Sequence, residues 1–243
     1  MEDSKKESKA KNFIKRYCNN KLAVIGFFTL VLITLIVIIA PPFLPFSEAE
    51  IDPLAFNMPP SAKHLLGGDD VGRDVLSRLL YGGRVSLAVG IFSTAVSVIV
   101  GIPLGMLAAF YRGAFEVVVM RLSDIFMSFP STILILFLVS MFGPSIITVT
   151  VVIGVLGWPK FARQIYGSVL SIREKDYIEG AVAIGAKDKL IITRYILPNA
   201  VAPIFISITF RIASAIILES SLSFLGMGVQ PPAASWGNML YNA

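Results

Sequence analysis

The residues best placed to do chemistry are four ionisable side chains inside apolar stretches: Arg121, Asp124, Arg211 and Glu219. Ionisable groups at membrane depth are costly and usually face a helix-bundle interior or water. Arg121 and Asp124 are three residues apart, so they can form an ion pair on one helix face. Arg211 and Glu219 are about two helical turns apart. We expect each to face a partner helix or a watery cavity, and both a structural and a functional role remain open.

Recognisable catalytic sets are absent from the sequence. No G-x-x-x-x-G-K-[ST] run provides a nucleotide phosphate cradle, so ATP-driven work would need another polypeptide. The single histidine, His64, and the single cysteine, Cys18, cannot form a Cys/His metal cluster, and we expect His64 at the surface. The acidic run at Asp69 and Asp70 lacks the spacing of a calcium loop. We therefore expect no metal and no cofactor in this chain.

The composition indicates an integral membrane protein. Of the 243 residues, 55% are hydrophobic and only 15% are charged, against about 25% charged in a typical soluble domain. Lys and Arg concentrate between Lys5 and Lys21 and between Lys160 and Arg194. Both regions are predicted to be cytoplasmic by the positive-inside rule, so the net charge of +5 does not indicate nucleic-acid binding.

The elements that must position these groups are predicted to be membrane-spanning helices, which gives an all-α polytopic bundle. About 20 apolar residues are needed to cross the hydrocarbon. A basic cytoplasmic tail, residues 1–21, precedes a single membrane domain, residues 22–243. The expected spans are Leu22–Ala40, Ser86–Phe110, Phe115–Phe142, Ser145–Phe161 with its helix continuing to Ile172, and Ala200–Phe224.

A polar segment, residues 41–85, separates the first two spans and is expected outside the cytoplasm. Its prolines break any helix early on. Its second half has apolar residues at helical spacing, beginning at Val75, with basic residues between them. That pattern predicts a separate amphipathic helix lying at the membrane interface.

A second polar segment, Tyr177–Pro198, interrupts the apolar second half of the chain. We expect a short helix, a turn at Gly185, a second charged helix and a new start at Pro198. Glu179 would lie in the first turn, where it suits the helix dipole. The small residues that would let another protein approach the backbone closely are Gly180, Ala181, Ala183 and Gly185. A solvated helical hairpin is the alternative interpretation.

Both polar segments resemble those of permeases of ATP-binding-cassette (ABC) importers. The spacing of Glu179-Gly180-Ala181, Gly185 and Ile196-Leu197-Pro198 resembles the EAA loop, whose coupling helix docks on an ATPase subunit in that family. The earlier segment resembles the signature of the oligopeptide, dipeptide and nickel branch, although Gly68 stands where the family more often has Thr. The matching residues are Gly67, Asp69, Gly72, Arg73, Asp74, Ser77, Arg78, Tyr81, Gly82, Arg84, Ser86 and Leu87.

The resemblance implies a type I ABC importer permease fold, with five spans here and a sixth expected in the family. It implies a homologous second permease, two ATPase subunits that carry ATP and Mg, and an extracytoplasmic solute-binding protein. The coupling loop, residues 163–198, would be cytoplasmic, as would the N-terminus, in a bacterial cytoplasmic membrane. Peptides or a related solute such as a nickel chelate would be transported without covalent chemistry in this subunit. The four intramembrane charges leave a self-contained channel or ion-coupled carrier as the alternative.

Overall fold

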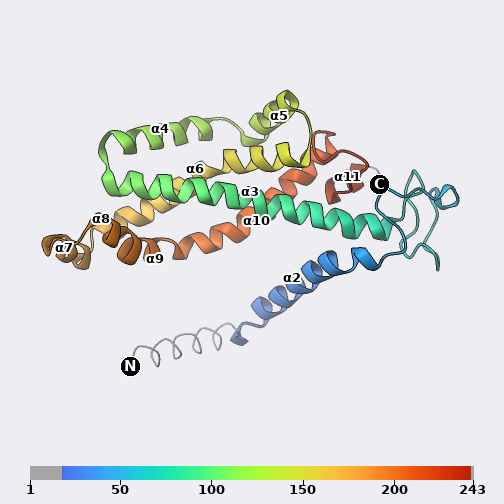
Figure 1. The fold of residues 1–243 in the computed structure, drawn as a ribbon, viewed down its shortest axis with the longest axis horizontal. Coiled ribbons are helices and arrows are strands. Elements are labelled where there is room, and N and C mark those ends of the chain that lie inside the picture. Colours follow the sequence, from blue (N-terminus) through green and yellow to red (C-terminus); the bar gives the residue numbers. More distant parts are fainter. Residues whose placement is uncertain (1–17, 242–243) are drawn as a thin grey trace.

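The computed structural model describes residues 18–241, which form an elongated bundle of helices (Figure 1). Most of the predicted basic tail lies outside these residues. The described residues contain two isolated β-bridges but no sheet. The elements are α2 (Lys21–Ile39), η1 (Pro41–Phe43), η2 (Pro53–Ala55), α3 (Val75–Tyr111), α4 (Gly113–Ser128), α5 (Ser131–Phe142), α6 (Ile146–Arg173), α7 (Asp176–Ala183), α8 (Asp188–Leu190), the π-helical turn η3 (Ile191–Ile196), α9 (Leu197–Ala200), α10 (Ala202–Phe224) and α11 (Trp236–Tyr241).

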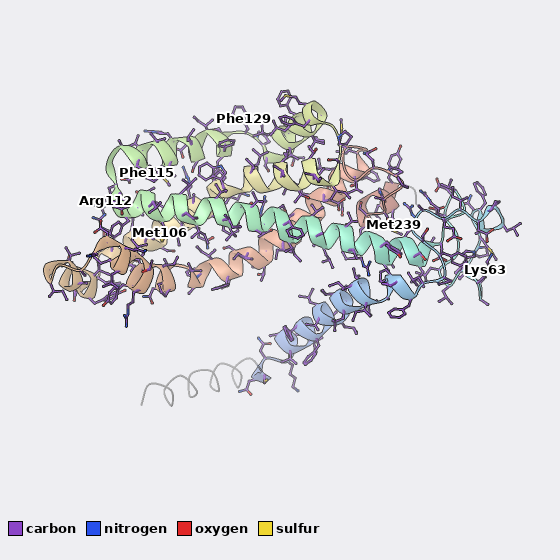
Figure 2. The ribbon with its side chains drawn as sticks, viewed as in Figure 1. Lys63, Met106, Arg112, Phe115, Phe129 and Met239 are labelled. Atoms are coloured by element: carbon purple, nitrogen blue, oxygen red, sulfur yellow. The ribbon has the colours of Figure 1, made fainter. Side chains whose placement is uncertain are left out.

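The bundle has two distinct ends (Figure 1). The α7 end carries α7, α8 and the turn from α3 to α4. The loop end carries the segment from 41 to 74, called here the 41–74 loop, together with α11. Figure 2 shows Arg112 and Phe115 at the α7 end and Lys63 at the opposite end, in the loop.

Within residues 18–241, four helices are long and apolar enough to cross a membrane: α2, α3, α6 and α10. The pair α4 and α5 would make a fifth span if it counts as one, which agrees with the predicted number. Apolar side chains of α2 are exposed around nearly its whole circumference, as expected of a helix surrounded by lipid.

The prediction of one continuous third span was wrong, because α4 and α5 meet at an angle of 88°. Pro130 lies at the break. The residue before a proline is pushed away from helical geometry, and Phe129 is extended, with φ −96° and ψ 143°. The proline therefore ends α4 instead of merely kinking it.

The prediction of a separate interfacial helix before the second span was also wrong. Residues from Val75 onward form the first turns of α3, which runs without a break to Tyr111. A helix of 37 residues is about 55 Å long, whereas the hydrocarbon core is about 30 Å thick. Of the basic residues that suggested an interfacial helix, Arg78 contacts the 41–74 loop and Arg84 contacts the end of α2.

The closest helix pair is α3 with α6, whose backbones nearly touch. A Cβ atom built on Gly105 would lie 2.1 Å from the carbonyl oxygen of Ala162, and one on Gly101 would lie 2.6 Å from that of Trp158. From α6, Gly154 meets α3 in the same way, and its carbonyl accepts a 2.7 Å hydrogen bond from the Ser97 hydroxyl. Small residues and interhelical hydrogen bonds are the usual means of joining helices in lipid.

Substitution of Gly105 tests this close approach. We expect Gly105→Ala to lower the melting temperature of the detergent-solubilised protein, because overpacking typically costs about 1–3 kcal/mol. Gly167→Ala is the matched control, since its Cβ on α6 would meet nothing within 4 Å. Equal melting temperatures for the two variants would show that the contact is looser than described.

Candidate functional site

The segment after α6 folds into a compact elbow, defined here as residues 176–187. Helix α7 ends in a Schellman motif: Gly185 N–H donates to the Val182 carbonyl at 2.9 Å, and Ala186 N–H donates to the Ala181 carbonyl at 3.0 Å. This ending requires a left-handed residue, and Gly185 has φ +76°. Both the short helix and the turn at Gly185 are confirmed.

The two faces of α7 differ in what they contact. Ile178 and Ala181 are buried against the bundle. Tyr177, Val182 and Ile184 are exposed, Ile184 at 86%. Three exposed apolar side chains at one end of a bundle form a surface suited to a protein partner.

Most of the predicted docking residues lie on the outward side of the elbow. Glu179, Gly180, Ala183 and Gly185 are exposed, and a Cβ on either glycine would meet nothing within 4 Å. Ala181 and Ile196 are the exceptions, because both are buried. The small size of Ala181 lets α7 approach the bundle, so the expectation that a partner reaches Ala181 was wrong.

An apolar cluster anchors the elbow to the bundle. Ile178 packs in one group with Ile165 and Val169 of α6 and with Ala109 of α3. Ile196 belongs to the same cluster and is fully buried. The elbow is thus tied to both helices of the closest pair.

Arg173 strengthens this attachment. Its guanidinium, at the end of α6, donates to the carbonyls of Ala109 and Phe110 at 3.3 and 2.7 Å. These carbonyls lie in the last turn of α3, where a cation also suits the helix dipole. Arg173 also lines a groove of about 370 Å³ beside α7, with Ile178 and Glu179 among its walls.

The return from the elbow is irregular. The predicted second charged helix is a single turn, α8, followed by the π-helical turn η3. Pro198 lies in the first turn of the short helix α9, as expected, and is exposed. Single π-turns often occur at functional sites, and this one lies between the elbow and α10.

The 41–74 loop is organised around the carboxylate of Asp69. It accepts hydrogen bonds from the backbone N–H groups of Val71 and Arg73, at 3.0 and 2.9 Å, and from the Arg73 side chain at 2.7 Å. Arg78, from the first turns of α3, lies 3.4 Å from the same carboxylate. Burial acts to raise the pKa of Asp69, but these donors outweigh it and hold the pKa below its ordinary value.

The expectation of a surface histidine was wrong, because His64 is buried inside the loop. Its Nδ1 lies 2.9 Å from the Asp74 carboxylate, which also caps α3 by accepting from Ser77 N–H at 2.8 Å. Nearby, hydrogen bonds from the Lys63 ammonium and the Leu54 N–H lower the pKa of Asp52 to about 2. Asp74 thus satisfies one ring nitrogen of the buried His64, and the other, Nε2, lies 3.5 Å from the Asp52 carboxylate.

The remaining signature residues join the loop to its surroundings. Gly67 and Gly72 have positive φ, and Gly82 allows Ser235 to approach the backbone of α3. Tyr81 donates to the Pro41 carbonyl of η1, and Arg84 donates to the Val37 and Ile38 carbonyls at the end of α2. Gly68, where the family more often has Thr, leaves no room for a Cβ, which would lie 1.8 Å from the Ala55 carbonyl oxygen.

The four predicted intramembrane charges do not come together in one site. Arg121 is 3.8 Å from Asp124, as expected, but its side chain is 79% exposed. Asp124 forms its closer ion pair with Arg163 of α6. Asp124 thus ties α4 to α6 through Arg163 and links two turns of α4 through Arg121.

Glu219 lies in a polar network near the loop end. It is fully buried and accepts hydrogen bonds from Ser86 at 3.0 Å and from Ser223 at 2.7 Å. The Ser86 hydroxyl also accepts from the Trp236 N–H at 3.2 Å. This network joins α3, α10 and α11.

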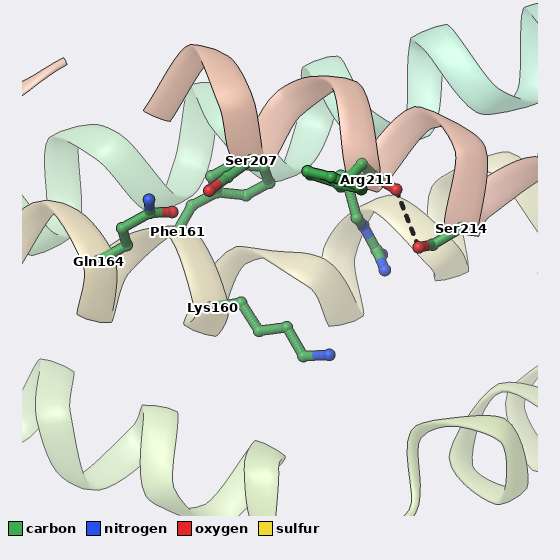
Figure 3. Close-up of a pocket in the computed structure, with 7 residues that line it drawn as sticks. Lys160, Phe161, Gln164, Ser207, Arg211 and Ser214 are labelled. Atoms are coloured by element: carbon green, nitrogen blue, oxygen red, sulfur yellow. Dashed lines mark hydrogen bonds between the residues drawn. The ribbon is translucent and has the colours of Figure 1, made fainter. Parts of the chain in front are cut away.

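Arg211 instead lies at a pocket of about 350 Å³ between α6 and α10 (Figure 3). Its Nη2 donates to the Ile153 carbonyl at 2.8 Å. The pocket is also lined by Lys160, Phe161, Gln164, Ser207, Phe210 and Ser214.

The sequence was compared with known families and proteins. Residues 101–243 match the binding-protein-dependent transport system inner membrane component, and residues 8–60 match the N-terminal TM domain of oligopeptide transport permease C. The chain belongs to this family of ABC importer permeases. It is therefore a multi-pass inner-membrane protein and a translocation subunit.

Individual relatives agree along nearly the whole chain. The dipeptide transport system permease protein DppC of Alkalihalophilus pseudofirmus is 38% identical over 93% of this chain and 74% of its own length. The glutathione transport system permease protein GsiD of Pectobacterium atrosepticum is 40% identical over 96% of this chain and 78% of its own. The inward-facing MetNI methionine ABC transporter, with a TM-score of 0.57, 22% identity and coverage of 68% of this chain and 79% of its own, shows the shared permease fold.

Several residues that matter to the permease were not predicted from its sequence. Arg163 and Arg173 each lie in a basic stretch that was interpreted only as a sign of membrane orientation. The helical spacing of Lys160 and Gln164, four residues apart, was a usable signal, since such residues share one helix face.

Substitution of Asp69 tests the organisation of the loop. We expect Asp69→Asn to speed amide hydrogen exchange in residues 47–74 by about tenfold or more, because hydrogen bonds to a charged group contribute about 1.5–3 kcal/mol. Asp70→Asn is the matched control, since Asp70 is half-exposed and 3.7 Å from Arg73. Unchanged exchange in both variants would contradict the central position of Asp69.

Proposed function

We propose that this chain is one permease subunit of an ATP-driven importer of short peptides, and that its elbow docks on an ATPase subunit. The supporting observation is that the elbow combines an exposed apolar surface with a rigid attachment. Tyr177, Val182 and Ile184 face outward, while Ile178 and Arg173 fix the elbow to α6 and α3. A partner that grips this surface would move the closest helix pair as one body.

The α7 end is the cytoplasmic end in this proposal. Lys175, Lys187, Lys189 and Arg194 lie in or beside the elbow, and the positive-inside rule places such residues in the cytoplasm. The 41–74 loop is then on the outer side, where a solute-binding protein would deliver the solute. The N-terminus, before α2, is cytoplasmic.

The proposed assembly contains a homologous second permease, two ATPase subunits and a solute-binding protein. ATP and Mg bind only to the ATPase subunits, so this subunit is non-catalytic and carries no cofactor. ATP binding would favour one of two states of the assembly by its differential affinity for them. Peptides are proposed as solutes because the named relatives are permeases of dipeptide and glutathione transport systems, and residues 8–60 match a domain of oligopeptide transport permease C.

A self-contained channel or ion-coupled carrier has less support. Such a carrier needs ionisable groups that can change partners along a path. Asp124 is already paired with Arg163, and Glu219 already accepts from Ser86 and Ser223.

Substitution of Gly185 tests the docking proposal. We expect Gly185→Glu to reduce both peptide uptake and solute-stimulated ATPase activity of the reconstituted assembly by more than about tenfold, since central interface residues contribute about 2 kcal/mol or more. Membrane insertion of the variant should match that of the unsubstituted chain.

Gly143→Glu is the matched control. Gly143 also has a positive φ, +87°, and open space around its Cβ, but it lies between α5 and α6, away from the elbow. This variant should retain most of the uptake. Normal uptake by Gly185→Glu would overturn the proposal, as would an equal loss in both variants.

A further inference from the structure

The pocket between α6 and α10 has an unusual lining for the middle of a membrane bundle. Two of its lining residues are cations, Lys160 and Arg211, and three more are polar but neutral. None of its lining residues is a carboxylate. Arg211 lies near the middle of α10, at a depth where cations are costly, and Lys160 is an exposed residue of α6 at the point where its predicted span ends.

The polar residues form two facing stripes. On α10, Ser207, Arg211 and Ser214 follow one another at spacings of four and three residues, which places them on one face. On α6, Lys160 and Gln164 do the same. Figure 3 shows these side chains around one space, with the Ser214 hydroxyl bonded back to the Phe210 carbonyl and thus not competing for the arginine.

Arg211 is held in place but largely unsatisfied. Gly157 leaves room for it, because a Cβ there would lie 2.5 Å from the arginine Nη2. The guanidinium has five N–H donors, and one hydrogen bond is formed, to the Ile153 carbonyl. Its Nε is buried and has no hydrogen-bond partner. The remaining donors are available to an acceptor in the pocket.

Neither cation has an internal counter-charge. Among residues 18–241, the carboxylates that form ion pairs do so with other cations, and none pairs with Lys160 or Arg211. Asp124, also within the bundle, is paired with Arg163. An uncompensated cation at membrane depth destabilises the bundle. Binding of an anion would compensate the charge of Arg211 and would explain why an arginine is found there.

We propose that this pocket binds the carboxylate of the transported solute, with Arg211 as its main donor and Lys160 as a second positive charge. A guanidinium can bind a carboxylate through two parallel hydrogen bonds. The identity of the occupant rests on the proposed peptide-import function, since every peptide with a free C-terminus carries this group.

The test measures the electrostatic preference of the pocket in the reconstituted assembly. Cys18→Ser removes the single cysteine of the chain, and Ser214→Cys then places a reporter thiol in the pocket. The thiol is labelled with an anionic (sulfonatoethyl) or a cationic (trimethylammonioethyl) methanethiosulfonate. The anionic-to-cationic ratio of labelling rates is then divided by the same ratio measured for free cysteine.

We expect the anionic reagent to be favoured by about tenfold or more, because a cleft lined by one sign of charge concentrates the opposite ion. Arg211→Gln should abolish the preference and Arg211→Lys should retain it, which separates charge from packing. Arg121→Gln, at an exposed arginine of α4, should leave it unchanged. A dipeptide should slow the labelling, and the same dipeptide amidated at its C-terminus should not.

Equal rates for the two reagents would overturn the proposal. So would a preference that appears in the isolated chain but disappears in the assembly, since an acidic residue of the second permease would then occupy the pocket. ATP-dependent uptake of the dipeptide by the Cys18→Ser assembly is measured in the same vesicles. Its loss contradicts the proposed import function, whereas intact uptake with equal labelling rates contradicts only the pocket proposal.

Discussion

The backbones of α3 and α6 approach each other so closely that glycine is the only residue that fits at Gly101, Gly105 and Gly154. Burial of apolar surface does not drive helices together in lipid, so close packing and interhelical hydrogen bonds must do so. The Ser97 hydroxyl supplies one such bond. The other elements depend on this pair, because α4, α5, α10 and the elbow all pack on it.

The two ends of this pair are secured by different chemistry. At the α7 end an apolar cluster and Arg173 fix the elbow, and the elbow leaves its own apolar side chains exposed. At the loop end, Asp69 and Asp74 hold the 41–74 loop on the start of α3, and Glu219 joins α3 to α10. The signature residues of the loop therefore mainly stabilise the packing of the 41–74 loop on the start of α3. Between the ends, Lys160 and Arg211 line the pocket between α6 and α10, and neither forms an ion pair with a carboxylate of residues 18–241.

The sequence correctly predicted the elements that are determined by a local pattern of residues. Apolar runs predicted the spans, and Gly185 predicted a helix ending that needs a positive φ. The break at Pro130 and the continuous α3 were not predicted, because hydropathy measures apolar length and not direction. The environments of His64 and Ala181 were not predicted correctly, because each depends on partners that the local pattern does not show, whereas Arg211 faces a partner helix and a cavity, as expected. Only the fold brings Asp74 to His64, or leaves Arg211 without a carboxylate.

The central claim is that the elbow is the surface by which an ATPase subunit moves the bundle. The most direct measurement is disulfide or short-linker crosslinking in the assembled complex, with Ile184→Cys introduced into the Cys18→Ser chain. Ile184 is exposed in the isolated chain, so its thiol should crosslink to an ATPase subunit. A cysteine at Gly167, exposed on α6, should not do so. An elbow thiol that stays free and fully reactive toward solvent in the complete assembly would contradict the account.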